Sequence, residues 1–274
     1  MKHTVKRILI TGDDGYQSPG TRLLARLLKP YFECMIVATK HGMSGVGGAL
    51  SIRNGGTFGT DTVEGVPALW IDGYPCDAME FLVERGYGTF DLVLSGINWG
   101  MNISGAIVSS GTYSAAIRAL HLGHAPHAIA ISWFIPAKEL TKHHAQKNRN
   151  DDTIEDLLVY PGQTAVDTIL LAIRNNFWDA DILNINLPQM PSKTIRFTKG
   201  LEKLTSFFNY PLVADESTGH FSYPIGEFKT HSKIAPDTDT GALLSGYISI
   251  SPHRKSNLDE ALFEKLKSSA ITLP

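Results

Sequence analysis

Two neighbouring aspartates, Asp13 and Asp14, follow a short apolar run at residues 8–10. Adjacent carboxylates at the end of a buried strand repel each other and lose hydration, so they require compensation, most simply from a divalent cation. The alternative is that one aspartate caps the next helix while the other points into water. A dinucleotide-binding loop would carry glycines instead, and the two carboxylates would repel its pyrophosphate.

Two further loops offer oxygen donors. Residues 40–48 are rich in glycine, which lets the backbone approach a ligand closely, and Ser44 and His41 are the polar candidates there. Such a stretch taken alone is more often a flexible turn. In the other loop, the side-chain carbonyl of Asn98 is a hard ligand suited to Mg²⁺, Mn²⁺ or Ca²⁺. Its neighbour Trp99 is placed either to stack on a nucleobase or to pack the loop.

Residues 109–112, with the sequence Ser-Ser-Gly-Thr, open a predicted helix. Hydroxyls and unpaired backbone N–H groups together at a helix start suit an oxyanion such as phosphate. Ordinary capping by Ser109 or Ser110 is the simpler alternative for this loop alone. Three such loops at one edge of a sheet make a coincidence improbable.

The elements that must bring these loops together alternate between strands and helices. Continuous apolar runs predict buried strands at 8–10, 35–38, 92–94, 128–131 and 182–187. Apolar stripes with helical spacing fall at 23–28, 115–120 and 166–173. This alternation implies right-handed crossovers, so we expect a doubly wound α/β fold with a mostly parallel sheet in three layers. Ligands of such sheets bind at the carboxyl ends of the strands, where the three loops would meet.

We expect one domain over residues 1–274, with two departures from the regular pattern. Residues 138–156 are densely polar and predict an exposed insertion. Residues 197–252 contain no long helical pattern and alternate short apolar and polar pieces, which predicts a projecting β-rich arm that makes oligomer contacts. Residues 258–266 predict a terminal helix.

Composition excludes several classes of protein. With 43% hydrophobic residues and two cysteines in 274 residues, the chain is neither a disordered segment nor a disulfide scaffold. The net charge of -2 offers no basic field for duplex nucleic acid or an anionic membrane. The apolar runs are far shorter than the roughly 20 residues that cross a bilayer, and the first residues do not form a signal-peptide core. We expect a cytoplasmic protein with reduced thiols and a small-molecule partner.

Taken together, the motifs resemble the SurE family, the survival-protein 5'/3'-nucleotidases. The similarity is collinear from about residue 7 to 252. It rests on Asp13-Asp14-Gly15 with Pro19-Gly20, Ser44-Gly45, Ser95-Gly96-Ile97-Asn98 with Asn102, Ser110-Gly111-Thr112, Asn184-Ile185-Asn186-Leu187-Pro188, and Thr238-Asp239 followed by Gly246-Tyr247. The chain departs from the family at Gly12, where an asparagine is usual.

The resemblance implies a site and an activity. The implied metal ligands are Asp13, Asp14, Ser44 and Asn98, around one Mg²⁺ or Mn²⁺ per subunit. The implied phosphate contacts are Asn102, Ser110, Gly111 and Thr112. The implied reaction is hydrolysis of nucleoside 5'-monophosphates, with 3'-monophosphates as a further substrate. The family also forms dimers or tetramers that exchange the C-terminal extension, so a homodimer or homotetramer is expected.

Our hypothesis is metal-assisted phosphomonoester hydrolysis in which Asp13 and Asp14 are catalytic and either one accepts a proton from water. A covalent aspartyl-phosphate mechanism requires a second aspartate two residues after the first, where this chain has Gly15 or Tyr16. The remaining alternative is a protein that binds nucleotide and metal as a sensor and has lost turnover.

Overall fold

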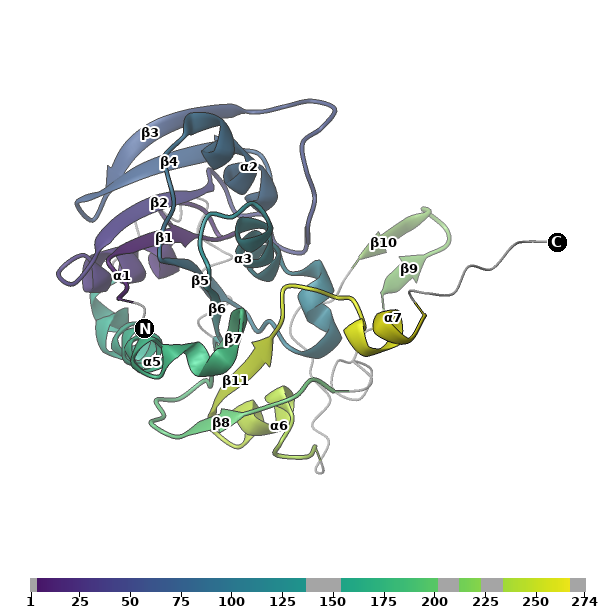
Figure 1. The fold of residues 1–274 in the computed structure, drawn as a ribbon. Coiled ribbons are helices and arrows are strands. Elements are labelled where there is room, and N and C mark those ends of the chain that lie inside the picture. Colours follow the sequence, from purple (N-terminus) through teal and green to yellow (C-terminus); the bar gives the residue numbers. More distant parts are fainter. Residues whose placement is uncertain (1–3, 137–153, 202–211, 223–233, 267–274) are drawn as a thin grey trace.

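The apolar runs of the sequence form the middle of a nine-stranded sheet in a computed structural model, which describes residues 4–136, 154–201, 212–222 and 234–266 (Figure 1). The strands lie in the order β3-β4-β2-β1-β5-β6-β7-β11-β8. Their bounds are β1 (Arg7–Thr11), β2 (Glu33–Thr39), β3 (Thr57–Val63), β4 (Val66–Asp72), β5 (Leu92–Trp99), β6 (Ala128–Trp133), β7 (Ile182–Leu187), β8 (Ile195–Phe197) and β11 (Ile248–His253).

The centre of the sheet is parallel, as predicted. Strands β4, β2, β1, β5, β6 and β7 pair in parallel, whereas β3 is antiparallel to β4 and β11 is antiparallel to β7. Strand β8 pairs in parallel with β11 at the far edge. The chain runs from β1 outward to β2 and β4, then returns to place β5 on the other side of β1. Strand order therefore reverses between β1 and β5, and such a reversal is where open α/β sheets bind ligands.

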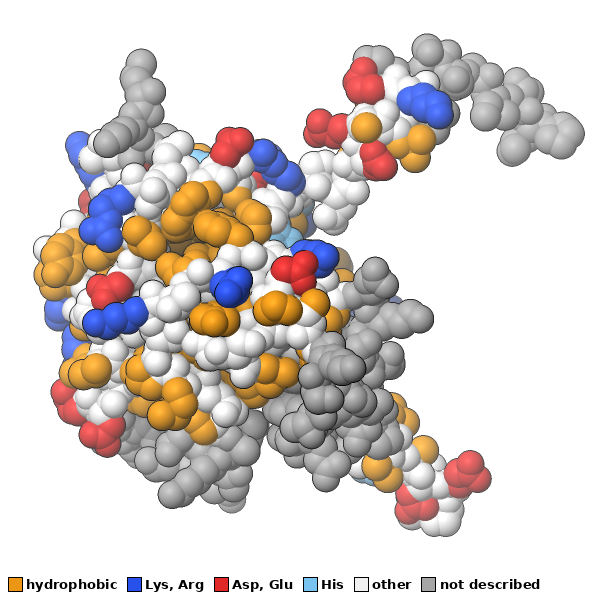
Figure 2. Space-filling model, turned by 90° about the horizontal axis from the view of Figure 1, so that it is seen from below, with side chains coloured by type: hydrophobic (Ala, Val, Ile, Leu, Met, Phe, Trp, Pro, Cys, Tyr) orange, Lys and Arg blue, Asp and Glu red, His pale blue; other side chains and the backbone are white. Residues whose placement is uncertain are grey.

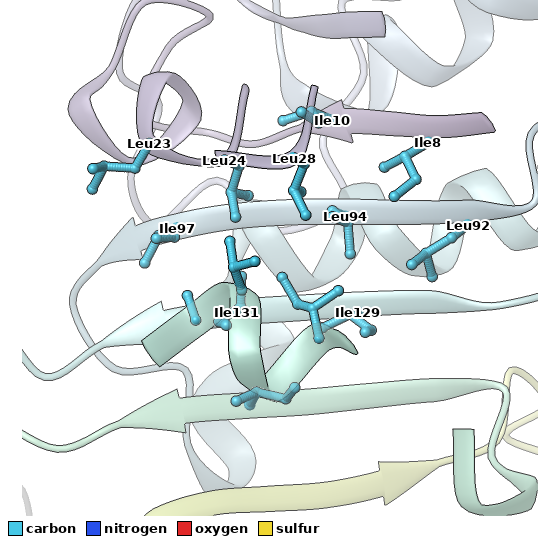
Figure 3. Close-up of a cluster of buried hydrophobic side chains, with 14 of the residues drawn as sticks. Ile8, Ile10, Leu23, Leu24, Leu28, Leu92, Leu94, Ile97, Ile129 and Ile131 are labelled. Carbon is cyan, nitrogen blue, oxygen red and sulfur yellow. The ribbon is translucent and has the colours of Figure 1, made fainter. Parts of the chain in front are cut away.

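Helices cover both faces of the sheet, which confirms the doubly wound α/β fold. Helices α1 (Pro19–Leu28) and α5 (Thr164–Arg174) pack on one face, and α2 (Pro75–Arg85) and α3 (Gly111–His121) pack on the other. Figure 3 shows Leu23, Leu24 and Leu28 of α1 at the first of these interfaces, beside isoleucines and leucines of β1, β5 and β6. All three leucines are fully buried, and burial of such side chains contributes about 1.5–3 kcal/mol each.

The start of α1 is encoded locally. Ser18 accepts a hydrogen bond from the N–H of Thr21, and Pro19 occupies the first helical position, where no hydrogen bond is lost. Gly20 faces β5 so closely that a Cβ atom there would lie 1.9 Å from the carbonyl oxygen of Ile97. A glycine is therefore required for α1 to pack against the end of β5.

The C-terminal region corrects one prediction. We expected residues 197–252 to project as an arm, but the two ends of this range belong to the body of the protein. Phe197 ends β8, β11 is a strand of the main sheet, and helix α6 (Asp239–Leu244) packs against β11 and β7. The described hairpin of β9 (Val213–Asp215) and β10 (His220–Ser222) does stand apart from the layers (Figure 1). The alternating Ile and Ser residues of β11 belong to a strand of the main sheet and not to the predicted arm.

Two other predictions concern residues 258–266 and 138–156. The terminal helix is present as α7 (Glu260–Leu266). The polar insertion at 138–156 falls mostly outside the described residues.

On the face drawn in Figure 2, acidic and basic side chains are interspersed among hydrophobic ones, so neither sign of charge forms a continuous field there. Among the described residues, every helix is too short or too polar to span a membrane.

Candidate active site

Asp13 lies two residues after the end of β1, at the point where strand order reverses, and its carboxylate contacts Thr112 in the first turn of α3. Figure 1 shows β1 and β5 side by side at this reversal. The Asp13 carboxylate accepts a hydrogen bond from the Thr112 hydroxyl at 2.5 Å, and its main-chain carbonyl accepts one from the N–H of Met43 at 2.6 Å. Only 5% of the residue is exposed. The carboxylate is thus held between β1, the loop after β2 and the start of α3.

The surroundings of Asp13 favour its protonated form. Burial, followed by the nearby charge of Asp14, raises the pKa of Asp13 to about 7. Hydrogen bonds from the Thr112 side chain and from the backbone of Asp13 and Thr112 act in the opposite direction without cancelling the shift. Within the described part of the chain, the charged group that contributes to the shift is Asp14. A cation near the two carboxylates would oppose the shift by favouring their charged forms.

Asp14 and Asn98 come from the two strands on either side of the reversal. The Asp14 carboxylate accepts a hydrogen bond from the N–H of Trp99 at 3.0 Å, which ties the loop after β1 to the end of β5. The side-chain nitrogen of Asn98 donates to the carbonyl of Gly100 at 3.0 Å, so the other end of the amide, Oδ1, is the atom suited to a metal. The Trp99 ring lies edge-on to Trp133 with centroids 5.6 Å apart, which matches the loop-packing interpretation.

Ser44 sits in a loop that is anchored on both sides of the candidate site. Met43, the residue before it, bonds the Asp13 carbonyl, and the N–H of Gly47 bonds the carbonyl of Ser109 at 3.0 Å. The serine itself is exposed. Because its loop bridges Asp13 and the segment that leads into α3, Ser44 is placed at the same edge as the two aspartates.

The start of α3 is built around Asp13. Ser110 caps the helix by accepting a hydrogen bond from the N–H of Tyr113 at 2.9 Å. A Cβ atom at Gly111 would lie 2.7 Å from Cβ and Oδ2 of Asp13, so only glycine lets the helix approach the carboxylate this closely. Thr112 donates its hydroxyl proton to Asp13. The sequence motif therefore positions an acid, a role that sequence reasoning missed, and its contact with phosphate stays a prediction.

The hydrogen bonds of Asn102 differ from those of the other predicted site residues, because its partners are side chains of β6 and β7. It is buried, and its side-chain nitrogen donates to the Ser132 hydroxyl at 2.8 Å. Its main-chain carbonyl accepts hydrogen bonds from the side chains of Asn184 and Asn186, and its N–H donates to Asn186. These bonds fasten the loop after β5 to β6 and β7. The signal available in the sequence was the pair of asparagines two residues apart, which share one face of a strand.

The strand ends beneath the carboxylates are polar. Thr11 and Thr39 are fully buried at the carboxyl ends of β1 and β2, and Ser95 is fully buried in the middle of β5, where it pairs with Thr11. Their hydroxyl oxygens have no hydrogen-bond partner within the described part of the chain. Spare hydrogen-bonding capacity below a pair of carboxylates suits a hydrated cation better than an apolar ligand.

The donor set at this edge fits a hard divalent ion. Asp13, Asp14, Ser44 and Asn98 offer only oxygen ligands, as Mg²⁺ and Mn²⁺ prefer. Within the described ranges, no group of three or more His, Cys, Asp or Glu side chains lies close enough to hold a metal ion, so an ion at this edge would also need the oxygens of Ser44 and Asn98. A Cβ atom added at Gly12 would lie 3.5 Å from the backbone nitrogen of Gly96. This is an ordinary contact distance, so a side chain at position 12 would have room.

Comparisons with known proteins point to one family. The family model described as survival protein SurE matches residues 8–206. A 5'-nucleotidase SurE of Methanopyrus kandleri is 36% identical over 189 residues, which is 66% of each chain. A 5'/3'-nucleotidase SurE of Cronobacter sakazakii is 30% identical over 253 residues, which cover 90% of this chain and 89% of that protein. The crystal structure of a SurE protein from Aquifex aeolicus superposes with a TM-score of 0.67 at 28% identity, covering 96% of this chain and 98% of the other.

Proposed function

The chain belongs to the SurE family, and we propose that it is a divalent-metal-dependent nucleotidase that releases phosphate from nucleoside 5'-monophosphates. The relatives named 5'-nucleotidase and 5'/3'-nucleotidase support this class of reaction, and they also support 3'-monophosphates as substrates. The observation that carries the proposal is the buried Asp13 carboxylate, which contacts the first turn of α3 and whose pKa is raised by burial and by the charge of Asp14.

Asp13, Asp14, Ser44 and Asn98 would hold one Mg²⁺ or Mn²⁺. A divalent ion at such a site supplies polarisation of the phosphate and a lower pKa for bound water. The side chains and backbone around the two aspartates hold their carboxylates in place. The Thr112 hydroxyl and the closely packed Gly111 keep the Asp13 carboxylate in one orientation, and the Trp99 N–H does the same for Asp14.

The phosphate would lie beside the N-terminus of α3, at the same edge of the sheet as the two carboxylates. The Ser110 hydroxyl uses a lone pair as the helix cap, so its proton is available to a phosphate oxygen. Backbone N–H groups at the helix start add partial positive charge where the transition state gains negative charge. Asp13 or Asp14 would accept the proton of the attacking water.

The same proposal extends to the state of the protein in the cell. Asn102 would contact the phosphate through the loop that it fastens. We further propose a homodimer or homotetramer in the cytoplasm that acts on small molecules. The net charge of -2 argues against duplex nucleic acid or an anionic membrane as partner. Both described cysteines are free and buried, which is compatible with a reducing compartment.

Phosphate release tests the function. Purified protein is incubated with the common nucleoside 5'- and 3'-monophosphates in Mg²⁺, in Mn²⁺ and in chelator. We expect release in the presence of metal and none in chelator. Binding of nucleotide without release in any condition would favour the sensor alternative, and release that persists in chelator would refute the dependence on metal.

A further inference from the structure

The Thr238-Asp239 motif of the sequence lies outside the candidate site, yet its aspartate is more deeply buried than Asp13. Asp239 begins helix α6 and is 1% exposed, and Thr238 caps the helix by accepting a hydrogen bond from the N–H of Gly241 at 3.1 Å. Helix α6 packs beside β11, towards the β8 edge of the sheet (Figure 1). Burying a carboxylate costs free energy unless hydrogen bonds replace the lost water. The partners of Asp239 therefore indicate what the residue does.

The main partner of Asp239 is Ser104, which lies 135 residues earlier in the chain. One carboxylate oxygen of Asp239 accepts a hydrogen bond from the N–H of Ser104 at 2.5 Å, and the other accepts one from the Ser104 hydroxyl at 2.7 Å. Ser104 begins a short 3-10 helix, Ser104–Ser109, that leads directly into Ser110 at the start of α3. Asp239 therefore holds the beginning of the segment that ends at the predicted phosphate contacts.

The backbone of Ser104 needs this support. Its φ is 51°, in the left-handed region that is uncommon for a residue other than glycine. Such conformations persist where the surrounding structure fixes them, and they concentrate at functional sites. A second stretch also holds the residue, because the N–H of Leu201 donates to the Ser104 hydroxyl oxygen at 2.7 Å. Ser104 is thus fixed by two separate parts of the C-terminal third of the chain.

The segment between Ser104 and α3 depends on its ends for its position. Val108 is 79% exposed and Ser109 is exposed, so burial does little to hold this segment. Asn102, two residues before Ser104, is fastened to β6 and β7 by the hydrogen bonds described above. The loop after β5 is therefore held at two points by side chains from later in the chain, one of them in α6.

We propose that Asp239 is a positioning residue for the substrate phosphate, acting through Ser104 on the loop that carries Asn102 and leads to Ser110. The inference rests on the proposed function, because it places the phosphate beside the N-terminus of α3. Asp239 does not touch the substrate in this role, since its carboxylate oxygens bond Ser104 and Thr240. A loop that is already held loses less entropy when the phosphate binds.

The first test replaces the carboxylate with an amide of the same shape. In Asp239→Asn one end of the side chain becomes a donor, so it can no longer accept hydrogen bonds from both the N–H and the hydroxyl of Ser104. Asp237→Asn is the matched control, because Asp237 lies two residues earlier in an exposed ion pair with Lys199 at 3.0 Å.

We expect the KM for nucleoside 5'-monophosphates to rise about tenfold in Asp239→Asn while kcat stays within about twofold of wild type. Both constants should be unchanged in Asp237→Asn. A merely structural role would give the opposite division, because a smaller fraction of folded enzyme lowers kcat and leaves KM as it is.

Ser104→Ala is a milder variant that tests the same contact, and it decides the question by KM if Asp239→Asn does not fold. It removes the hydroxyl and keeps the N–H, so we expect a smaller rise in KM. If the two residues act through one contact, the double variant should have nearly the KM of Asp239→Asn alone. Fully additive effects on KM would show that Asp239 does not act through Ser104.

A binding measurement separates this inference from the proposed function. Inorganic phosphate is titrated calorimetrically into each protein in Mn²⁺, and we expect about tenfold weaker phosphate binding in Asp239→Asn with unchanged Mn²⁺ affinity. If phosphate binding weakens in this way but wild type releases no phosphate from any nucleotide, the nucleotidase proposal fails and the positioning role stands. If wild type hydrolyses nucleotides and neither KM nor phosphate affinity changes in Asp239→Asn and Ser104→Ala, the positioning role is wrong.

Discussion

Two acidic groups near α1 experience opposite environments. Glu64, in the turn between β3 and β4, bonds Arg22 and Arg26 of α1 at 2.8 and 2.7 Å. Burial alone would raise the pKa of Glu64, but the hydrogen bonds and charges of the two arginines lower it overall. Asp13 is more deeply buried, has Asp14 as its charged neighbour, and has a raised pKa.

The difference separates a carboxylate with cationic partners from the one on which our functional proposal rests. Two arginines contact Glu64, so the charge of Glu64 stabilises the native state. The neighbours of Asp13 are a threonine hydroxyl, a helix start and a second carboxylate, and in our proposal a bound cation completes this arrangement. Perturbed acids of this kind concentrate at functional sites.

The largest expected effect is on activity. Asp13→Asn and Asp14→Asn should each reduce phosphate release from nucleoside 5'-monophosphates by at least about a hundredfold, because each removes a charged ligand. Steady-state kinetics in Mn²⁺ measure it. Glu64→Gln is the matched control and should retain wild-type kcat/KM. Near-wild-type turnover in both aspartate variants would show that the two aspartates are no more important for activity than Glu64.

A smaller loss is expected when the acid is displaced and not removed. Gly111→Ala places a Cβ atom 2.7 Å from Asp13, so the carboxylate must shift. A displacement of this order at a catalytic group costs about a hundredfold at most in kcat/KM. Gly48→Ala is the control, since a Cβ atom there meets open space. Equal activity in the two alanine variants would show that the close approach of α3 to Asp13 is unimportant.

Stability without metal should depend on pH in opposite ways at the two sites. The folded pKa of Asp13 is raised, so the stability contributed by its proton is complete below pH 3.8 and is lost as pH rises through about 7. In chelator, the Tm of wild type should therefore fall from about pH 4 to about pH 7 relative to that of Asp13→Asn, and the difference should level off at higher pH. Thermal unfolding at several pH values measures this, and Mn²⁺ should restore wild type only. A constant difference in Tm would contradict the raised pKa.

The smallest effect concerns Glu64. Its folded pKa is lowered, so its contribution is present above the unfolded value of 4.5 and disappears as pH falls below it. Glu64→Gln should destabilise the protein by about 1 kcal/mol at pH 7, the scale of a partly exposed ion pair. Denaturant unfolding at pH 7 and pH 3.5 checks this. A loss that is equally large at pH 3.5 would assign the effect to packing.

Much of the fold could be predicted because its signals are local. Strands β1, β2, β5, β6 and β7 are buried along most of their length and are built around apolar runs, as is typical of strands covered on both faces. The hairpin of β3 and β4 was missed because β3 is exposed and carries Thr, Gly and Asp, which mask the period of two. Its signal was the Glu64-Gly65 turn, where both residues have positive φ.

The site was predictable as a set of loops but not as a set of contacts. Asp13, Asp14, Ser44 and Asn98 come to one edge because parallel strands end together. The roles of Thr112 toward Asp13 and of Asn102 toward β7 depend on side-chain partners about 80 to 100 residues away in the chain. Long-range pairings of this kind carry no periodic signal in the sequence.

Binding of Mn²⁺ tests the central claim most directly, because it does not depend on substrate or turnover. Electron paramagnetic resonance and calorimetry measure the number of ions bound per chain and their affinity in wild type, Asp13→Asn, Asp14→Asn and Glu64→Gln. We predict one ion per chain in wild type and Glu64→Gln, with affinity at least about tenfold weaker in each aspartate variant. Unchanged Mn²⁺ affinity in both aspartate variants would contradict a metal site at the carboxyl ends of β1 and β5.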